Sequence, residues 1–346
     1  MLRRPLLSMA LAVAPALLLP APSQAANGLR PRTPAVFDGV PCTQTITRGE
    51  AMAIAYGVPF DDTELTADEL PDSRTQQFFA YSRVRFDYHF PVWITQADLD
   101  RAEANGDVTM EFGPEDVLES SAEWPASTWL RITPDDPRLP ITMAQAAMGV
   151  TWDTSSVAPG TWVIAAYTWE PENNLWSPRF GAVRIEDPAD PAATGPTVFL
   201  PRADGLIANR GESLLVSGCV DAPAGSTITA SWGTIAGGIH EPAWVPFLED
   251  EPVETGALEL DFVAPAEAGA TIKLRVEISD PDGRSYVAYT PTTIAVVGEV
   301  MEMDDDGGGD GCGCAADRPR GPGALLGLVV LLGLRRRRDP LLRTRA

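Results

Sequence analysis

Histidine is nearly absent from this chain of 346 residues, which contains only His89 and His240. Nucleophilic triads need an imidazole beside the nucleophile, and histidine-based metal centres need several such ligands. The chain also lacks the sequence motifs of serine hydrolases, zinc proteases and nucleotide-binding loops. We therefore expect His89 to be a solvated residue and His240 to be an ordinary loop residue.

Basic residues are few beside acidic ones: 26 Lys and Arg stand against 48 Asp and Glu, a formal charge of −22. Without residues 1–26 and those after Ala316, 16 basic and 46 acidic residues remain, and the net charge falls to about −30. Such a surface repels phosphate backbones, which excludes nucleic acid as a partner. It fits a protein solvated outside the cell or bathed in divalent cations.

A long apolar run is also missing, and the two short ones lie near the chain ends. Arg3 and Arg4 precede the apolar residues 6–19, and Ser23-Gln24-Ala25 supplies small residues at a cleavage site. This order is typical of a secretory signal peptide, residues 1–25, cut after Ala25. The alternative, an N-terminal membrane anchor, is disfavoured because the run is short and a cleavage site follows it. We expect the mature protein to be exported.

The second apolar run, residues 324–334, follows an acidic Gly-rich linker at 299–311 and precedes four arginines at 335–338. Counted from Gly321 it has 14 residues and reaches roughly 21 Å, short of the ~30 Å hydrocarbon core of a bilayer. It is therefore marginal as a permanent span, although we predict a short transmembrane segment here. The arginines would stay in the cytoplasm.

The order Cys312-Gly313-Cys314, short apolar segment and Arg cluster resembles the MYXO-CTERM sorting signal over residues 312–338. The resemblance implies recognition by an intramembrane sorting protease, removal of the helix near the cysteines, and delivery to the cell surface or outer membrane. It also implies that Cys312 or Cys314 is the processing or lipid-attachment residue. Residues 339–346 depart from the family, whose signals usually stop at the arginines.

Thirty-two prolines and 30 glycines favour turns and short strands over long helices. After an extended arm at 26–41, a β-rich domain is predicted for 42–188. Residues 83–90 alternate apolar and polar side chains, which predicts a strand. Thr95 is a cap for a short helix from Gln96 to Ala104, which Asn105-Gly106 ends. Residues 161–169 are apolar on both faces and predict a central strand. With the return strand at 180–186, this hairpin resembles those of immunoglobulin-like and fibronectin type III-like modules.

A Pro-rich linker at 189–196 separates this domain from a second one at 197–298. Its expected strands are 212–220, 227–232, 257–263, 271–279 and 285–297, and the pattern resembles a bacterial immunoglobulin-like or PKD-like domain. The predicted class is therefore all-β: two tandem immunoglobulin-like β-sandwich domains between a cleaved signal peptide and a short C-terminal transmembrane sorting segment. The absence of βαβ alternation disfavours α/β enzyme folds.

Four cysteines are present, and Cys42 and Cys219 lie in the exported domains. In an oxidising compartment two such residues often form a disulfide, whereas the alternative is two buried free thiols. No C-x-x-C pair with histidine partners occurs, so a structural zinc site is not expected.

Three sets of residues carry weaker functional hypotheses. Asp280 and Asp282 flank a strand end and would suit calcium, although Asp-Pro-Asp-Gly is also an ordinary hairpin turn. Trp162, Trp169 and Trp176 would suit stacking on a glycan, although cross-strand packing is the commoner role. Carboxylate pairs such as Asp61 and Asp62 would suit a hydrolase, although chance pairs are expected among so many acids.

We therefore expect a non-enzymatic structural or adhesive module displayed at the cell surface, with no cofactor unless calcium is bound. The alternatives are a carbohydrate-binding surface protein and a secreted carboxylate-based hydrolase. A glycan or protein ligand is not identified by the sequence.

Overall fold

The computed structural model describes residues 33–62, 76–106, 108, 110–134, 141–169, 174–191, 194–201, 206–236 and 240–298. All of the described residues belong to one compact unit. The predicted signal peptide and the C-terminal linker, Cys motif, apolar segment and Arg cluster lie outside the described residues. Within those residues, no helix is long and apolar enough to span a bilayer.

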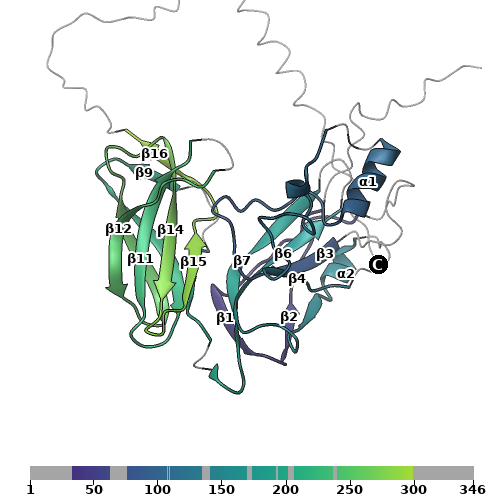
Figure 1. Ribbon diagram of the computed structural model, residues 1–346, viewed down its shortest axis with the longest axis horizontal. Helices are drawn as coiled ribbons and strands as arrows, with labels where there is room; N and C mark the ends of the chain where they lie inside the picture. Colours follow the sequence, from purple (N-terminus) through teal and green to yellow (C-terminus); the bar gives the residue numbers. More distant parts are fainter. Residues whose placement is uncertain are drawn as a thin grey trace, which may run out of the picture. The chain divides into compact units, whose positions relative to one another are not determined.

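The chain folds as an all-β protein with two tandem sandwiches, as predicted (Figure 1). The first is built on a five-stranded sheet in the order β1-β7-β6-β3-β4. These strands are β1 Thr43–Thr47, β7 Leu175–Glu186, β6 Gly160–Thr168, β3 Gln76–Tyr81 and β4 Trp129–Arg131. β1 runs parallel to β7, and the other neighbours are antiparallel.

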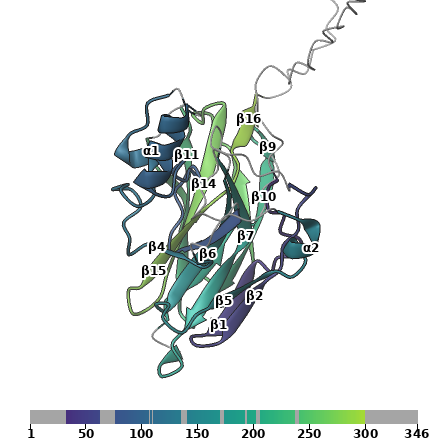
Figure 2. The same ribbon diagram turned by 90° about the vertical axis from the view of Figure 1, so that its right-hand side faces the viewer.

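Each face of this sheet is covered by its own hydrophobic core. One core lies under a two-stranded sheet of β2 (Ala51–Ile54) and β5 (Val150–Asp153). The other lies under α1 (Gln96–Asn105) and the chain that follows it. Figure 2 shows α1 well separated from the β2–β5 pair. Because both faces are covered, β6 is buried along almost its whole length, which confirms the central strand expected from its two apolar faces.

Two short helical turns complete the first sandwich: the 3₁₀ turn Pro114–Asp116 and α2, Met143–Ala146. The start predicted for α1 at Gln96 is confirmed, and the helix ends at Asn105, one residue after the predicted Ala104. The Thr95 hydroxyl accepts the Asp98 N–H, the Asp98 carboxylate accepts the Thr95 N–H, and Gly106 ends the helix in the left-handed region at φ 78°. These reciprocal bonds form a capping box, which satisfies backbone groups left free at a helix start.

The strand predicted at residues 83–90 is wrong. β3 ends at Tyr81, and the following residues form an irregular segment with a turn at Phe86 and Asp87 and a positive φ of 53° at Tyr88. The alternation that suggested a strand is still reflected in burial, because Val84, Phe86 and Phe90 are buried. They are buried in two different cores rather than on one face of a sheet.

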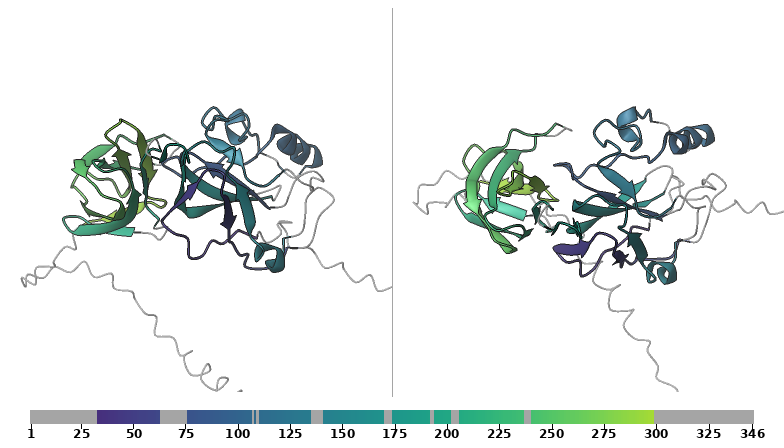
Figure 3. Two further views of the ribbon diagram at one scale, coloured as in Figure 1. Left: turned by 90° about the horizontal axis from the view of Figure 1, so that it is seen from below. Right: turned by 60° about the horizontal axis from the view of Figure 1, so that its bottom comes forward.

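The second sandwich pairs a three-stranded sheet with a larger one (Figure 3). The small sheet has the order β13-β10-β8, with β13 Gly256–Val263, β10 Ser213–Asp221 and β8 Thr197–Phe199. The larger sheet has the order β12-β11-β14-β16-β9, and β15 also pairs with β14. Its strands are β12 Val245–Pro252, β11 Thr227–Thr234, β14 Thr271–Ser279, β15 Ser285–Tyr289, β16 Ile294–Val297 and β9 Leu206–Asn209.

Inward-facing residues of both sheets meet in one core, which includes Leu260, Phe262, Leu274 and Val276. The single strand expected at 285–297 is in fact two, β15 and β16, separated by a bend at Pro291. Proline cannot donate to a strand ladder, which explains the break.

Candidate functional site at the junction of the two sandwiches

A shared hydrophobic core joins the two sandwiches. The first contributes Val84, Phe86, Val163 and Ala182, and the second contributes Phe199, Cys219 and Tyr289. We call this region the junction. Val84 and Phe86 of the irregular segment 83–90 enter the junction, and this is the physical reason that they do not line one face of a sheet. Burial of this kind is the main favourable term in domain association.

A disulfide crosses the junction between Cys42 and Cys219, with an Sγ–Sγ distance of 2.06 Å and a Cα–Cα distance of 6.2 Å. Cys42 directly precedes β1, and Cys219 lies in β10 beside Phe199 of β8. The bond therefore joins the start of the first strand of one sandwich to the middle strand of the three-stranded sheet of the other. Of the two arrangements that the sequence left open, the structure contains the disulfide.

Polar contacts surround the shared core. The hydroxyls of Thr161 and Thr197 lie 2.6 Å apart, and both residues are buried. The Tyr88 hydroxyl donates to the Tyr289 carbonyl at 3.2 Å. The Thr45 hydroxyl donates to the Asp221 carboxylate, which also lies 3.8 Å from the Arg184 guanidinium. Each contact links one sandwich to the other. Hydrogen bonds as well as apolar packing therefore hold the interface together, and these polar groups have partners.

Lys273 is the only lysine in the chain, and it lies at this junction with 4% of its surface exposed. Its Nζ donates to the carbonyls of Thr290 and Pro291 at 3.0 and 3.1 Å and sits 5.3 Å from the centre of the Tyr88 ring. Burial lowers the pKa of Lys273 to about 8, and the nearby charge of Asp87 opposes that shift in part. Burial also raises the pKa of Tyr88, with Tyr286 and Tyr289 adding to the effect.

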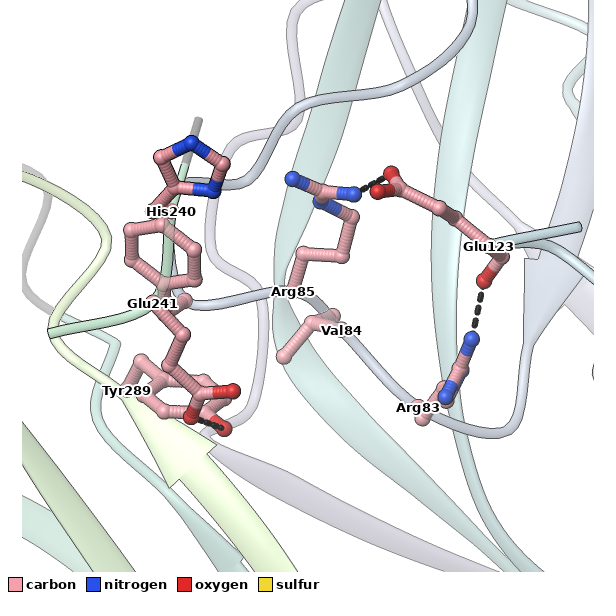
Figure 4. A pocket seen from close by; sticks show the side chains of 8 residues that line it. Arg83, Val84, Arg85, Glu123, His240, Glu241 and Tyr289 are labelled. Carbon is pink, nitrogen blue, oxygen red and sulfur yellow. Dashed lines mark hydrogen bonds and ion pairs between the residues drawn. The ribbon is translucent and has the colours of Figure 1, made fainter. Parts of the chain in front are cut away.

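A cavity of about 380 Å³ opens beside the shared core (Figure 4). Its polar lining consists of Arg83, Arg85, Glu123, His240, Glu241 and Tyr289. In Figure 4, His240, Glu241 and Tyr289 stand on one side, and the two arginines with Glu123 stand on the other. His240, Glu241 and Tyr289 belong to the second sandwich, whereas the arginines and Glu123 belong to the first. The cavity therefore exists only while the junction is formed.

The charged groups of this cavity are already engaged. Arg85 pairs with the Glu123 carboxylate and, at 3.1 Å, with Asp87, while Arg83 donates to the Glu123 carbonyl. Glu241 accepts from the Trp244 indole at 2.7 Å and from the Tyr289 hydroxyl at 3.4 Å. No Ser, Thr or Cys lies among the lining residues. The cavity is suited to hold a small polar group, and the hydroxyl in its lining, that of Tyr289, already donates to Glu241.

Asp87, a half-buried residue at the junction, has a shifted pKa that the sequence did not indicate. Burial would raise the pKa of Asp87, but hydrogen bonds from Arg85 and the His89 backbone, together with the Arg85 charge, hold it below its usual value. His89 itself is exposed. The signal that could have located the junction is the combination of a lone lysine with the alternating segment 83–90.

The three tryptophans proposed as a glycan platform lie in the cores of the first sandwich. Trp162 and Trp169 are 5% and 2% exposed and point into the cores on opposite faces of the sheet. Trp176 is half-buried, and its ring centre lies 5.0 Å from that of Phe90. Its indole N–H donates to the Pro91 carbonyl. Their rings stabilise these cores and do not form an exposed stacking surface.

The Asp280–Gly283 turn uses its carboxylates internally. Asp280 accepts backbone N–H groups from Asp282 and Arg284 and the Arg284 side chain at 2.6 Å, and Asp282 pairs with Arg284 at 2.8 Å. These bonds and the Arg284 charge outweigh the opposing effect of burial and lower the pKa of Asp280. Among the described residues, no group of three or more His, Cys, Asp or Glu side chains could hold a metal ion. Ala25, Cys312 and Cys314 lie outside the described residues.

Comparison with known proteins gives no family. No family model and no curated protein matches the chain. Among solved structures, a DUF3823-family protein from Bacteroides ovatus is 14% identical over 45% of this chain and 84% of its own, with a TM-score of 0.21. The four N-terminal Ig domains of Dscam1 isoform 6.44 are 13% identical over 77% of this chain and 51% of theirs, with a TM-score of 0.20. At these scores the superpositions carry no functional argument, and the fold assignment rests on the strand pairing above.

Proposed function

We propose that this chain is exported and displayed at the cell surface, where its two sandwiches act as one rigid, non-enzymatic structural or adhesive module. The observation that carries the proposal is the junction, in which a shared apolar core is crossed by the Cys42–Cys219 disulfide. Disulfides form and persist in oxidising compartments, so this bond supports a location outside the cytoplasm. A cross-linked pair of sandwiches also keeps its two ends at a fixed separation, which is useful in a displayed spacer.

In this proposal, segments near the two ends of the chain direct its delivery to the cell surface. The pattern at residues 1–25 directs export, with cleavage after Ala25. The signal at 312–338 is recognised by an intramembrane sorting protease, which removes the apolar segment and leaves Cys312 or Cys314 for attachment to the membrane or outer surface. The strongly acidic middle of the chain fits a solvated surface location. The rest of the chain is then the displayed part.

Neither alternative function is favoured by a specific observation. The glycan hypothesis depended on tryptophan rings that are packed in cores. The hydrolase hypothesis requires two carboxyl groups on either side of a cleft, one held protonated. The glutamates of the junction cavity are instead engaged by Arg85 and by Trp244 and Tyr289.

Surface delivery can be tested in the native host by adding protease to intact cells that carry either the wild-type chain or a Cys312→Ser/Cys314→Ser variant. We expect the wild-type protein to be digested from outside and the variant to be retained in the membrane fraction with its tail uncut. An Asp310→Ser variant, altered just before the Cys motif, serves as the matched control and should behave as wild type. Protection of the wild-type protein, or identical processing of the Cys variant, would contradict the proposal.

A further inference from the structure

Strand β13 ends the three-stranded sheet of the second sandwich, and one of its long edges pairs with no strand in the described part of the chain. Its eight residues pair with β10 in an unbroken register. The neighbouring edge strand β12 contains Pro246 and Pro252, two register shifts and Asp250 at φ 51°. Prolines and bulges are features that prevent strand addition at an edge. β13 has neither, so of these two edges it is the one that can pair with another strand.

A groove of about 500 Å³, lined by apolar residues together with Glu251, Glu259 and Asp261, lies between β12 and β13. Both sheets contribute apolar residues to this groove. Ile228 of β11 and Leu248 of β12 come from the larger sheet, and Leu258 and Leu260 of β13 come from the small one. Val253 closes the groove beside the turn that joins β12 to β13. Along β13 burial alternates, so that Leu258 and Leu260 are buried whereas Glu259 and Asp261 are exposed, and all four residues line the groove. A strand added at this edge would therefore place every second side chain over the groove.

Negative charge surrounds the groove. Six exposed carboxylates lie on β12, β13 and the turn between them, namely Glu249, Asp250, Glu251, Glu254, Glu259 and Asp261. Among the described residues, no Lys or Arg forms an ion pair with any of them. A second copy of this chain would bring the same charges together, and like charges directly opposite each other destabilise a strand pair. The charge therefore favours a cationic partner over self-association.

We propose that β13 binds an extended peptide segment as an added strand, and that the side chains of this segment alternate between apolar and basic. Backbone hydrogen bonds to the open edge would supply affinity, and the alternating side chains would supply specificity. Apolar residues lie over the groove beside Leu258 and Leu260, and basic residues lie beside Glu259 and Asp261. The inference rests on the proposed adhesive function in that it gives the module a partner. A failure here would leave the surface delivery of the chain untouched.

The direct test is fluorescence anisotropy of a labelled peptide of about ten residues that alternates valine and arginine. The matched control has the same composition with its valines and arginines in two separate blocks, and a further control replaces arginine by glutamate. We expect both controls to bind at least about tenfold more weakly. Two N-methylated versions of the alternating peptide sharpen the test, because only every second N–H of a strand faces its neighbour. Methylation of one set of amides should abolish binding and methylation of the other should be tolerated.

A matched pair of protein variants separates this site from general attraction to an acidic surface. Glu259→Lys/Asp261→Lys should weaken the alternating peptide by about tenfold or more, since two favourable cross-strand pairs become like-charge pairs. Glu103→Lys/Glu111→Lys makes the same change in charge on exposed residues of the first sandwich and should leave binding within about twofold. Circular dichroism verifies that both variants fold. Absence of binding by the wild-type protein, equal binding of the block peptide, or equal losses in the two variants would overturn the proposal.

Discussion

Without the junction disulfide, the two sandwiches should unfold in separate transitions. In a Cys42→Ala/Cys219→Ala variant the shared core of Val84, Phe86 and Tyr289 remains, so we expect the native structure to persist in dilute buffer. What is lost is the constraint on the unfolded chain. The two cysteines are separated by 177 positions, a long loop to close.

The magnitude follows from that loop. The chain-entropy model gives roughly 5 kcal/mol for a loop of this length, and measured disulfides typically contribute about 2–4 kcal/mol. We expect the variant to lose about 2–5 kcal/mol from its free energy of unfolding. We also expect its single cooperative transition to divide in two, because each sandwich has its own core and only the smaller shared core then couples them.

The assay combines guanidinium unfolding, followed by tryptophan fluorescence, with acylation of Lys273. As the only lysine, Lys273 provides the chain's single ε-amine, which the folded junction buries. In the wild-type protein its acylation should coincide with the loss of fluorescence, whereas in the variant it should begin at lower denaturant. A Cys312→Ala/Cys314→Ala variant controls for loss of cysteines elsewhere. Unchanged unfolding of the junction variant, or rapid acylation of Lys273 in the native wild type, would refute the reasoning.

Three further predictions concern single side chains. Folding lowers the pKa of Lys273 to about 8, so above that pH the unfolded chain holds more protons than the folded one. The free energy of unfolding should therefore rise by on the order of 2 kcal/mol from pH 8 to 10 in denaturant titrations. Lys273→Met should abolish this rise. Tyr286→Phe removes a buried hydroxyl with no hydrogen-bond partner and should lower the free energy of unfolding by under about 0.5 kcal/mol in urea melts. Tyr88→Phe removes the hydrogen bond to the Tyr289 carbonyl and should lower it by about 1 kcal/mol. The reverse order of the two losses would contradict the assignment. Thr95→Ala removes the cap of α1 and should lower the unfolding free energy by about 1 kcal/mol, and an unchanged thermal melt would show that the cap contributes nothing.

Local signals in the sequence were enough to place several elements. β6 was predicted as a central strand because both of its faces are apolar, and a strand buried on both sides needs that composition. α1 was located by Thr95 and Gly106, since capping geometry depends on only a few neighbouring residues. In both cases the structure is determined within a short stretch of chain, so the sequence alone predicts it.

Contacts between distant parts of the chain were not accessible in this way. The alternation at 83–90 reports burial correctly, but the partners of Val84 and Phe86 lie in the second sandwich. Periodicity cannot distinguish a sheet face from a segment inserted between two cores. The charged and proline-containing β12 was also missed as a strand, because an exposed edge strand has the composition of a loop.

The candidate site was predicted only in its parts. Cys42 and Cys219 were named, but whether they pair depends on a Cα–Cα distance that spacing along the chain does not give. Lys273, Tyr88 and Arg85 carried no recognisable motif. They become a site only when the two sandwiches meet, and that arrangement is a property of the fold.

The central claim is that an exported, cross-linked pair of sandwiches is displayed after its C-terminal signal has been removed. Intact-mass analysis of the protein isolated from its native envelope, with and without reduction, tests this most directly. The account predicts a chain that begins after Ala25, ends before Arg335 and gains two hydrogen masses when the Cys42–Cys219 bond is reduced. A product that retains the arginines at 335–338, or that shows no disulfide between the peptides holding Cys42 and Cys219, would contradict it.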